Sequence, residues 1–212
     1  MNDKHTPTTP TLLRIDASAR HQGSVSRQLA DQIQARWHAR WPQGRCISRD
    51  LAKEPVAQIE NLTIEAFYTP TAQLSPAQRA ATARSDELIA ELKAAHTLLI
   101  ATPIYNFAAP AALKAWIDQI VRMGQTFSYE NGQFQGLVLR PRAVLALSYG
   151  AAGYQGPLAQ MDFLRPYLSA LLGFLGITEI QVISAEATTA DAAIAAAQRR
   201  AAEAEITTLF AD

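Results

Sequence analysis

The chain has 212 residues, of which 49% are hydrophobic and 18% are charged. These proportions are typical of a globular protein and exclude a disordered chain. Lysine and arginine total 19, as do aspartate and glutamate, so the zero net charge does not indicate a nucleic-acid partner.

The first residues, MNDKHTPTTP, predict a flexible N-terminal tail over residues 1–10. They lack the apolar core of a secretory signal, and no apolar run approaches the roughly 20 residues that span a bilayer. Cys46 is the single cysteine, so an internal disulfide is excluded. We therefore expect a cytoplasmic protein with no membrane partner and with one domain over residues 11–212.

The first half of the chain alternates predicted strands and helices. Residues 11–17 (TLLRIDA) are short and apolar, as in a buried strand. A helix is expected from Ser24, which can cap it, and a second strand over 45–51. Residues 55–76 show no lasting period. The next predicted helix covers 75–95, with serine at its cap and proline just inside it.

The second half continues the alternation. Three strands and three helices are predicted in turn, at residues 96–102, 109–123, 142–148, 157–174, 179–185 and 190–210. Within this half, Asn131-Gly132 separates two short segments that carry aromatic residues. This pattern predicts a β-hairpin with a two-residue turn over 127–136.

Five strands that alternate with five helices predict an α/β fold. The expected form is flavodoxin-like: a five-stranded parallel sheet of order 2-1-3-4-5, with helices on both faces and an inserted hairpin. In such sheets ligands bind beyond the carboxyl ends of the strands, where the strand order reverses. That point lies between the first and third strands, so the loops after Ala17 and Thr102 are the first candidates for a site.

The first loop leads into a helix, whose N-terminus offers unpaired N–H groups to a phosphate. The hydroxyls of Ser18, Ser24 and Ser26 would add donors, and Arg20 or Arg27 would balance the charge. The alternative is that these serines only cap the helix. Neither G-x-G-x-x-G nor G-x-x-x-x-G-K-[ST] occurs in this loop, so a mononucleotide fits better than a dinucleotide or a P-loop nucleotide.

The second loop lies between Pro103 and Pro110. Its backbone would hydrogen-bond the polar edge of a flat ring, and its apolar groups would cover the ring face. The alternative is that Tyr105 and Phe107 are core aromatics at the end of a strand. It also stays open whether these side chains touch the ring or only their backbone does.

The third loop follows Ser148. Gly150, Gly153 and Gly156 would let its backbone approach a ligand closely, although an ordinary flexible connection has the same composition. The four histidines are scattered, and neither a metal motif nor a nucleophile elbow occurs. We therefore expect no metal and no catalytic side chain, because a site of this kind leaves the chemistry to its cofactor.

Together the loops and the hairpin resemble the FMN-dependent NADH-azoreductases, a flavodoxin-like family of quinone and azo-compound reductases. The resemblance extends from about Leu12 over nearly the whole chain. Its most specific segments are SVSR (24–27), PIYNFAAPAALKAWID (103–118) and GQTFSYENGQFQGLV (124–138).

This resemblance implies a set of residues that bind FMN: Ser18, Ser24, Val25, Ser26, Ile104, Tyr105, Asn106, Phe107, Ser148, Tyr149, Gly150 and Ala151. It also implies a homodimer with an active site at each subunit interface, where Tyr129 and Phe174 line a substrate pocket. The run Tyr149-Gly150-Ala151 stands where the family has an Arg-Gly-Gly-type run, which leaves the nicotinamide preference open.

The expected function is that of an FMN-dependent NAD(P)H oxidoreductase, which reduces quinones and azo compounds by two-electron ping-pong hydride transfer. The alternative is a flavodoxin-like FMN electron carrier without its own substrate pocket. The zero net charge and the hairpin argue against such a carrier. A third possibility is a protein that keeps the fold without flavin.

Overall fold

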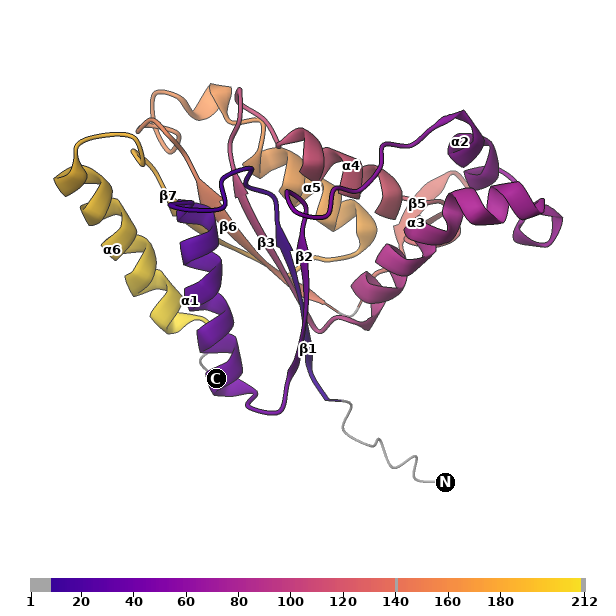
Figure 1. Ribbon diagram of the computed structural model, residues 1–212, viewed down its shortest axis with the longest axis horizontal. Helices are drawn as coiled ribbons and strands as arrows, with labels where there is room; N and C mark the ends of the chain where they lie inside the picture. Colours follow the sequence, from indigo (N-terminus) through magenta and orange to yellow (C-terminus); the bar gives the residue numbers. More distant parts are fainter. Residues whose placement is uncertain (1–8, 140, 211–212) are drawn as a thin grey trace.

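The structure is a computed structural model that describes residues 9–139 and 141–210. Most of the tail predicted at residues 1–10 lies outside the described residues. One sheet is formed by β1 (Thr11–Asp16), β2 (Arg45–Asp50), β3 (Thr97–Pro103), β6 (Arg142–Ser148) and β7 (Ile180–Ala185). Its order is β2-β1-β3-β6-β7 and every pair is parallel, which confirms the predicted order 2-1-3-4-5 (Figure 1).

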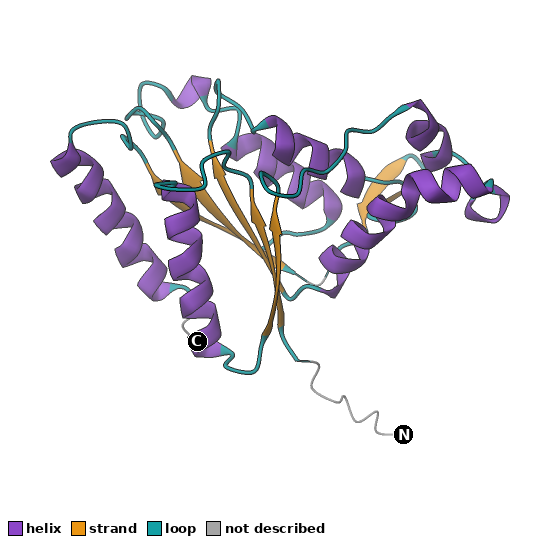
Figure 2. Cartoon of the chain, viewed as in Figure 1, coloured by secondary structure: helices purple, strands orange, loops and turns teal. Residues whose placement is uncertain are grey.

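Helices cover both faces of the sheet, as Figure 2 shows. The six α-helices of the described residues are α1 (Val25–Arg40), α2 (Asn61–Phe67), α3 (Pro76–Ala94), α4 (Ala111–Ile120), α5 (Arg165–Leu175) and α6 (Ala192–Thr208). The side chains of α1 and α6 share one buried cluster, and those of α3, α4 and α5 share the other. The predicted fold class is therefore confirmed, with one more helix than expected.

Strand β3 explains why two layers of helices are needed. Leu98 and Ile100 are fully buried in the α3–α5 cluster, and Leu99 and Ala101 are fully buried in the α1–α6 cluster. A central parallel strand with apolar side chains on both faces cannot be exposed on either face. Thr97 adds a polar anchor by accepting a 3.0 Å hydrogen bond from the indole N–H of Trp37 on α1.

The helix predicted over 75–95 has the expected start. Ser75 and Gln78 form a reciprocal capping box, and Pro76 occupies the first turn. By contrast, α2 and a short 3₁₀ turn at Thr71–Gln73 occur in the region where the sequence shows no period. A helix of two turns is too short to build a periodic pattern.

Two predicted helices are longer than the observed ones. The helix predicted over 109–123 ends at Ile120 as α4, because the Thr126 hydroxyl donates to the Ile120 carbonyl and accepts from the Arg122 N–H. The helix predicted over 157–174 begins only at Arg165, as α5. The Asp162 carboxylate accepts the N–H groups of Leu164 and Arg165 and so satisfies the start of α5 at this point.

The hairpin consists of β4 (Phe127–Glu130) and β5 (Gln133–Gly136), which pair in antiparallel fashion. Asn131 and Gly132 connect them with φ angles of 53° and 80°, which confirms the predicted two-residue turn. The hairpin packs directly on the end of α5. A Cβ atom added to Gly136 would lie 2.2 Å from the backbone nitrogen of Gly176, so only glycine permits this contact.

Candidate functional site

A cavity of about 280 Å³ opens at the carboxyl ends of β1, β3 and β6, which is the predicted switch point. Four loops and helix α6 contribute to its wall. The lining residues are Ser18, Arg20, Gly23, Ser24, Val25, Pro103, Ile104, Tyr105, Ser148, Gly150, Thr188, Thr189 and Arg199. Two of them are cations and none is a carboxylate, so the cavity favours an anionic ligand.

The N-terminus of α1 reaches this cavity through Ser24 and Val25. Ser24 is the N-cap residue by its backbone, but its side chain caps no N–H group of the helix. Its hydroxyl instead lies 3.3 Å from the hydroxyl of Ser26. The alternative that Ser24 caps the helix through its side chain is therefore wrong. Because the Ser24 side chain does not cap them, the first-turn N–H groups of α1, at the positive end of the helix dipole, are available to a phosphate.

Arg27 does not line this cavity. Its guanidinium donates two hydrogen bonds to the Asp50 carboxylate, at 2.8 and 2.7 Å, and a third to the Ser18 carbonyl at 2.8 Å. The hydrogen bonds between Arg27 and Asp50 lower the pKa of Asp50 and raise the pKa of Arg27. Arg27 therefore ties the first loop to the end of β2, and of the two arginines predicted to balance a ligand's charge only Arg20 lines the cavity.

The loop after β3 forms a tight turn. Tyr105 and Ala108 exchange two backbone hydrogen bonds of 3.0 Å, and Asn106 and Phe107 between them have φ angles of 47° and 69°. These angles lie in the left-handed region, which is uncommon for residues other than glycine and which concentrates at ligand sites. No described residue accepts the N–H groups of Asn106 and Phe107, so both can donate to a ligand.

Neighbouring loops hold this turn in place. The Ile104 N–H donates to the Ser148 carbonyl at 2.9 Å, and the Phe163 N–H donates to the Phe107 carbonyl at 3.0 Å. The side chain of Phe107 is 43% exposed and that of Tyr105 is half-buried. The alternative that both are core aromatics is therefore wrong.

The loop after β6 contributes Ser148 and Gly150 to the cavity wall. Tyr149 between them is buried, and its hydroxyl donates to the Asp162 carboxylate at 3.0 Å. Burial, together with the negative charge of Asp162, raises the pKa of Tyr149 above its ordinary value. The Tyr149 side chain thus stabilises the loop from beneath and does not line the cavity.

A buried carboxylate on the loop after β7 shapes the remainder of the loop after β6. Glu186 accepts the N–H groups of Gly153, Tyr154 and Gln155 at 2.6 to 3.2 Å. Three donors on one carboxylate fold the glycine-containing loop into a compact turn. The alternative of an ordinary flexible connection is not consistent with this arrangement.

The structure brings only part of the predicted set together. Seven of the residues predicted to bind FMN line the cavity: Ser18, Ser24, Val25, Ile104, Tyr105, Ser148 and Gly150. Five others do not: Ser26, Asn106, Phe107, Tyr149 and Ala151. The roles assigned to all of them remain predictions.

Tyr129 and Phe174 do not line this cavity. They belong to an aromatic cluster of the hairpin, in which the Phe134 ring lies 4.6 Å from the Tyr129 ring and 5.5 Å from the Phe174 ring between centroids. Beside the cluster, a groove of about 360 Å³ runs between α2, α4 and the hairpin. Phe134 lines this groove, whereas Tyr129 and Phe174 contact the Phe134 ring without lining the groove themselves, so within one chain the predicted substrate residues lie apart from the predicted cofactor residues.

Sequence reasoning missed Thr188, Thr189 and Arg199. The first two follow β7, which neighbours β6 in the sheet, and Arg199 lies on α6. The available signal was the pair Arg199-Arg200 within an otherwise alanine-rich helix. Whether either arginine faces the cavity depends on the packing of α6 beside α1, which this sequence pattern does not show.

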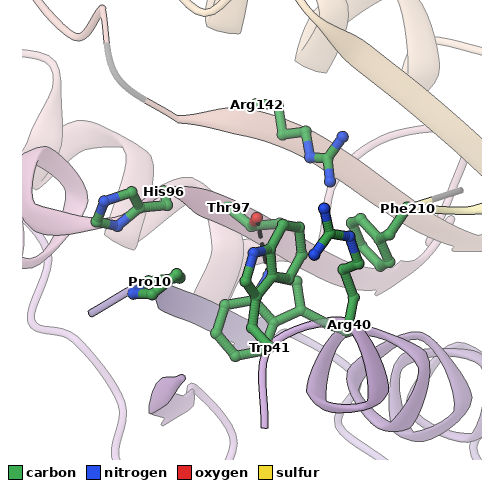
Figure 3. A pocket seen from close by; sticks show the side chains of 8 residues that line it. Pro10, Arg40, Trp41, His96, Thr97, Arg142 and Phe210 are labelled. Atoms are coloured by element: carbon green, nitrogen blue, oxygen red, sulfur yellow. Dashed lines mark hydrogen bonds between the residues drawn. The ribbon is translucent and has the colours of Figure 1, made fainter. Parts of the chain in front are cut away.

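A second cavity, of about 260 Å³, lies at the opposite ends of the strands (Figure 3). The Arg142 guanidinium stacks over the rings of Trp41 and Phe210, at 5.4 and 4.6 Å from their centroids. These contacts join α1, the sheet and the residues after α6. Sheets of this kind bind ligands at their carboxyl ends, so we assign this cavity a structural role.

Among the residues that the structure describes, no group of three His, Cys, Asp or Glu side chains could hold a metal ion. None of the described helices is long and apolar enough to cross a membrane.

Comparisons with known proteins show the family and the fold of this chain. Residues 10–209 match the family described as flavodoxin-like fold. An FMN-dependent NADH:quinone oxidoreductase from Xanthobacter autotrophicus is 51% identical over 174 residues, which cover 81% of this chain and 84% of the relative. A relative of the same name from Azotobacter vinelandii is 43% identical over 82% of this chain and 86% of its own length.

Solved structures show the same fold. An azoreductase from Bacillus anthracis superposes with a TM-score of 0.86 at 23% identity, over 93% of this chain and 97% of that one. An FMN-dependent NADH-azoreductase from the same species, in complex with FMN, gives a TM-score of 0.82 at 22% identity, over 94% and 98% of the two chains.

Proposed function

This chain belongs to the flavodoxin-like fold family and, within it, to the FMN-dependent NADH:quinone oxidoreductases, and from that premise we propose how its residues serve the reaction. Its cofactor is FMN, its electron donor is NADH and its acceptor is a quinone. When bound, FMN would supply the two-electron redox chemistry between the nicotinamide and the acceptor. One observation carries our proposal: the switch-point cavity combines a helix N-terminus, hydroxyl groups and two arginines with no carboxylate.

The donor set fits the phosphate of FMN. The first turn of α1 contains no acidic residue, and its N–H groups are not capped by Ser24. Ser18 and Ser24 line the same wall, whereas the Thr188 and Thr189 hydroxyls already donate to the carbonyls of Tyr149 and Gly150. A phosphate dianion would accept from the helix N–H groups and the two serine hydroxyls, and the helix dipole would favour its charge.

The turn after β3 borders the cavity through Ile104 and Tyr105, and we infer that the N–H groups next to them meet the polar edge of the isoalloxazine ring. Asn106 and Phe107 offer two neighbouring backbone N–H groups that no described residue accepts. Donors fixed in this way would favour negative charge on the ring's polar edge. We infer that the backbone, more than the Tyr105 and Phe107 side chains, recognises the ring, while Ser148 and Gly150 would hold the opposite edge.

We extend the proposal to azo compounds as acceptors, to NADPH as an alternative donor and to a ping-pong cycle in which donor and acceptor use the same face in turn. The resemblance of the 103–118 and 124–138 segments to azoreductases supports this extension. Cleavage of an azo bond to two amines takes four electrons, hence two cycles of two electrons each.

We also propose a homodimer. The hairpin exposes Tyr129 by 53% and Phe134 by 63%, and Tyr68 and Met123 beside the adjacent groove are also exposed. Exposed apolar residues gathered in this way are typical of an interface. A second copy on this face would complete a substrate pocket that includes Tyr129 and Phe174. The cytoplasmic location remains a prediction from the sequence.

The test is to purify the chain, record its visible spectrum with and without added FMN, and then add NADH and a soluble naphthoquinone anaerobically. We expect bound FMN, bleaching by NADH and recovery of the oxidised spectrum with one quinone per FMN. A protein that takes up no FMN would contradict the proposal. Bound FMN that NADH does not reduce would instead support the electron-carrier alternative.

A further inference from the structure

Helix α6 carries a cation into the switch-point cavity. Four residues of this helix, Ala195, Arg199, Ala202 and Ile206, recur at the spacing of one helix face. Ala195, Ala202 and Ile206 are buried and Arg199 is partly buried. The position of Arg199 within this stripe directs it toward the protein rather than into solvent.

Contacts with α1 fix the placement of this face. Ala202 and Ile206 pack in the same buried cluster as Leu29 and Ile33 of α1. Gln32 of α1 donates a 3.0 Å hydrogen bond to Glu203, which lies four residues after Arg199. The two helices therefore lie side by side, and Arg199 lines the same cavity as Gly23, Ser24 and Val25.

The charge of Arg199 is not balanced by a carboxylate among the described residues. Arg14, Arg27 and Arg122 are also buried or partly buried, and each forms an ion pair with an aspartate. Arg199 forms no such pair with any residue that the structure describes, although Glu203 lies one turn away, and no acidic residue is found among those that line its cavity. A partly buried cation without a partner favours a bound anion.

We propose that Arg199 binds the phosphate of FMN from the α6 side and sets a preference of this chain for the phosphorylated flavin. This inference rests on the proposed function, because it concerns the same cofactor site. The phosphate would meet the N-terminus of α1 on one side and a guanidinium on the other. A guanidinium presents several N–H donors in one plane, which suits the oxygens of a phosphate.

Arg20 has a lesser part in this arrangement. It lines the same cavity, and one of its guanidinium nitrogens lies 3.5 Å from the position of a Cβ on Gly23. Its side chain is exposed, so solvent and salt screen its charge more than that of Arg199.

The experiment compares Arg199→Gln with Arg200→Gln. Both variants lose one positive charge at adjacent positions of α6, but Arg200 is exposed and does not line the cavity. The apoproteins are titrated with FMN and, separately, with riboflavin, which lacks the phosphate, and binding is followed by flavin fluorescence. Titrations at low and high salt show whether the effect is electrostatic.

For Arg199→Gln we expect FMN affinity to fall by about tenfold or more. Riboflavin affinity should stay within about twofold, and the dependence of FMN binding on salt should weaken. Arg200→Gln should bind both flavins as the parent chain does. Arg199→Lys, which keeps the charge, should recover part of the FMN affinity.

Two results would overturn the inference while leaving the proposed function intact. In the first, Arg199→Gln binds FMN as tightly as the parent chain. In the second, FMN and riboflavin lose affinity equally, which would mean that Arg199 only supports the fold. If the unaltered chain binds neither flavin, the proposed function fails as well.

Discussion

Arg27 and Arg199 carry the same charge on neighbouring helices, but the protein uses them differently. Arg27 is held by Asp50 and by the Ser18 carbonyl, so it stabilises the first loop. Arg199 has no carboxylate partner among the described residues and lines the cavity. At the scale of single residues, the partner of a charge decides between a structural role and a role in binding.

The Arg27–Asp50 pair leads to a prediction about acid stability. Arg27 holds the pKa of Asp50 below its ordinary value of 3.8. A carboxylate whose pKa is lower in the folded state stabilises the fold above its unfolded-state pKa, and that stabilisation disappears as the pH falls through the folded-state pKa. We expect Asp50→Asn to lower the free energy of unfolding at pH 7 by about 1–3 kcal/mol.

Denaturant unfolding over a pH series tests this expectation. The difference between Asp50→Asn and the parent chain should shrink as the pH falls below about 4, because the parent then loses the same charge. A difference that stays constant down to pH 2 would mean that the substitution acts through packing instead.

The individual site residues show where sequence reasoning succeeds. Ser18, Ser24 and Ile104 follow strands whose order is predictable, so their meeting in one cavity could be expected. The different roles of Arg27 and Arg199 could not be expected from the sequence. Each role depends on whether the fold brings a carboxylate from a distant part of the sequence next to the arginine. The buried position of Tyr149 likewise depends on Asp162, on a segment that was predicted to be helical.

At the scale of elements, the loop between β6 and α5 is folded by one side chain. Glu186 is buried and accepts three consecutive backbone N–H groups, from residues 153 to 155. No local sequence pattern announces this contact, which joins residues more than 30 positions apart. For this reason the sequence left open an ordinary flexible connection at these residues.

We predict that Glu186→Gln loosens this loop. An amide would turn two hydrogen atoms of its own toward three donors and could accept with only one oxygen. Hydrogen exchange at Gly153–Gln155 should accelerate by about tenfold or more, and FMN affinity should fall because Gly150 belongs to the same loop.

Glu179→Gln is the matched control for this variant. Glu179 is an exposed carboxylate near the start of β7 and interacts with Arg142 at 3.5 Å. It should leave exchange in residues 153–155 unchanged. Equal exchange in the two variants would show that Glu186 does not hold the loop.

The contact between the hairpin and α5 leads to a second prediction about elements. Gly136 passes so close to Leu175 and Gly176 that an added Cβ would lie within 2.5 Å of three of their backbone atoms. Gly136→Ala should therefore push the hairpin away from α5 and destabilise the protein by about 1–3 kcal/mol.

Gly173→Ala serves as its comparison. Gly173 lies inside α5, and a Cβ there would meet nothing within 4 Å. This variant should stabilise the protein by up to about 1 kcal/mol in thermal or denaturant unfolding, because alanine favours a helix more than glycine does. Similar stability of both variants would contradict the proposed close approach.

At the scale of the whole molecule, the strand order could be predicted because five strands alternate with helices and crossovers are right-handed. The sequence pattern does not predict the apolar face formed by the hairpin and the adjacent groove, because that face depends on which side chains the packing leaves exposed. The homodimer that we propose would form through that face.

We predict that Phe134→Glu separates the homodimer. The charge would lie among the exposed aromatic residues of the hairpin, and a buried unpaired carboxylate would oppose association. Light scattering should find twice 23.1 kDa for the parent chain and 23.1 kDa for the variant.

Ile194→Glu is the control for the dimer. Ile194 is an exposed apolar residue near the start of α6 and lies outside the hairpin cluster. Its substitution should leave the mass unchanged. A parent chain of 23.1 kDa would contradict the dimer itself.

The left-handed turn at Asn106 and Phe107 has a consequence for how the cofactor arrives. Two backbone hydrogen bonds close this turn within the polypeptide, so its shape does not depend on a ligand. This turn therefore loses its conformational entropy when the chain folds, not when flavin binds. Association should then follow a single kinetic step whose observed rate rises linearly with FMN concentration, because no conformational change of this turn limits binding.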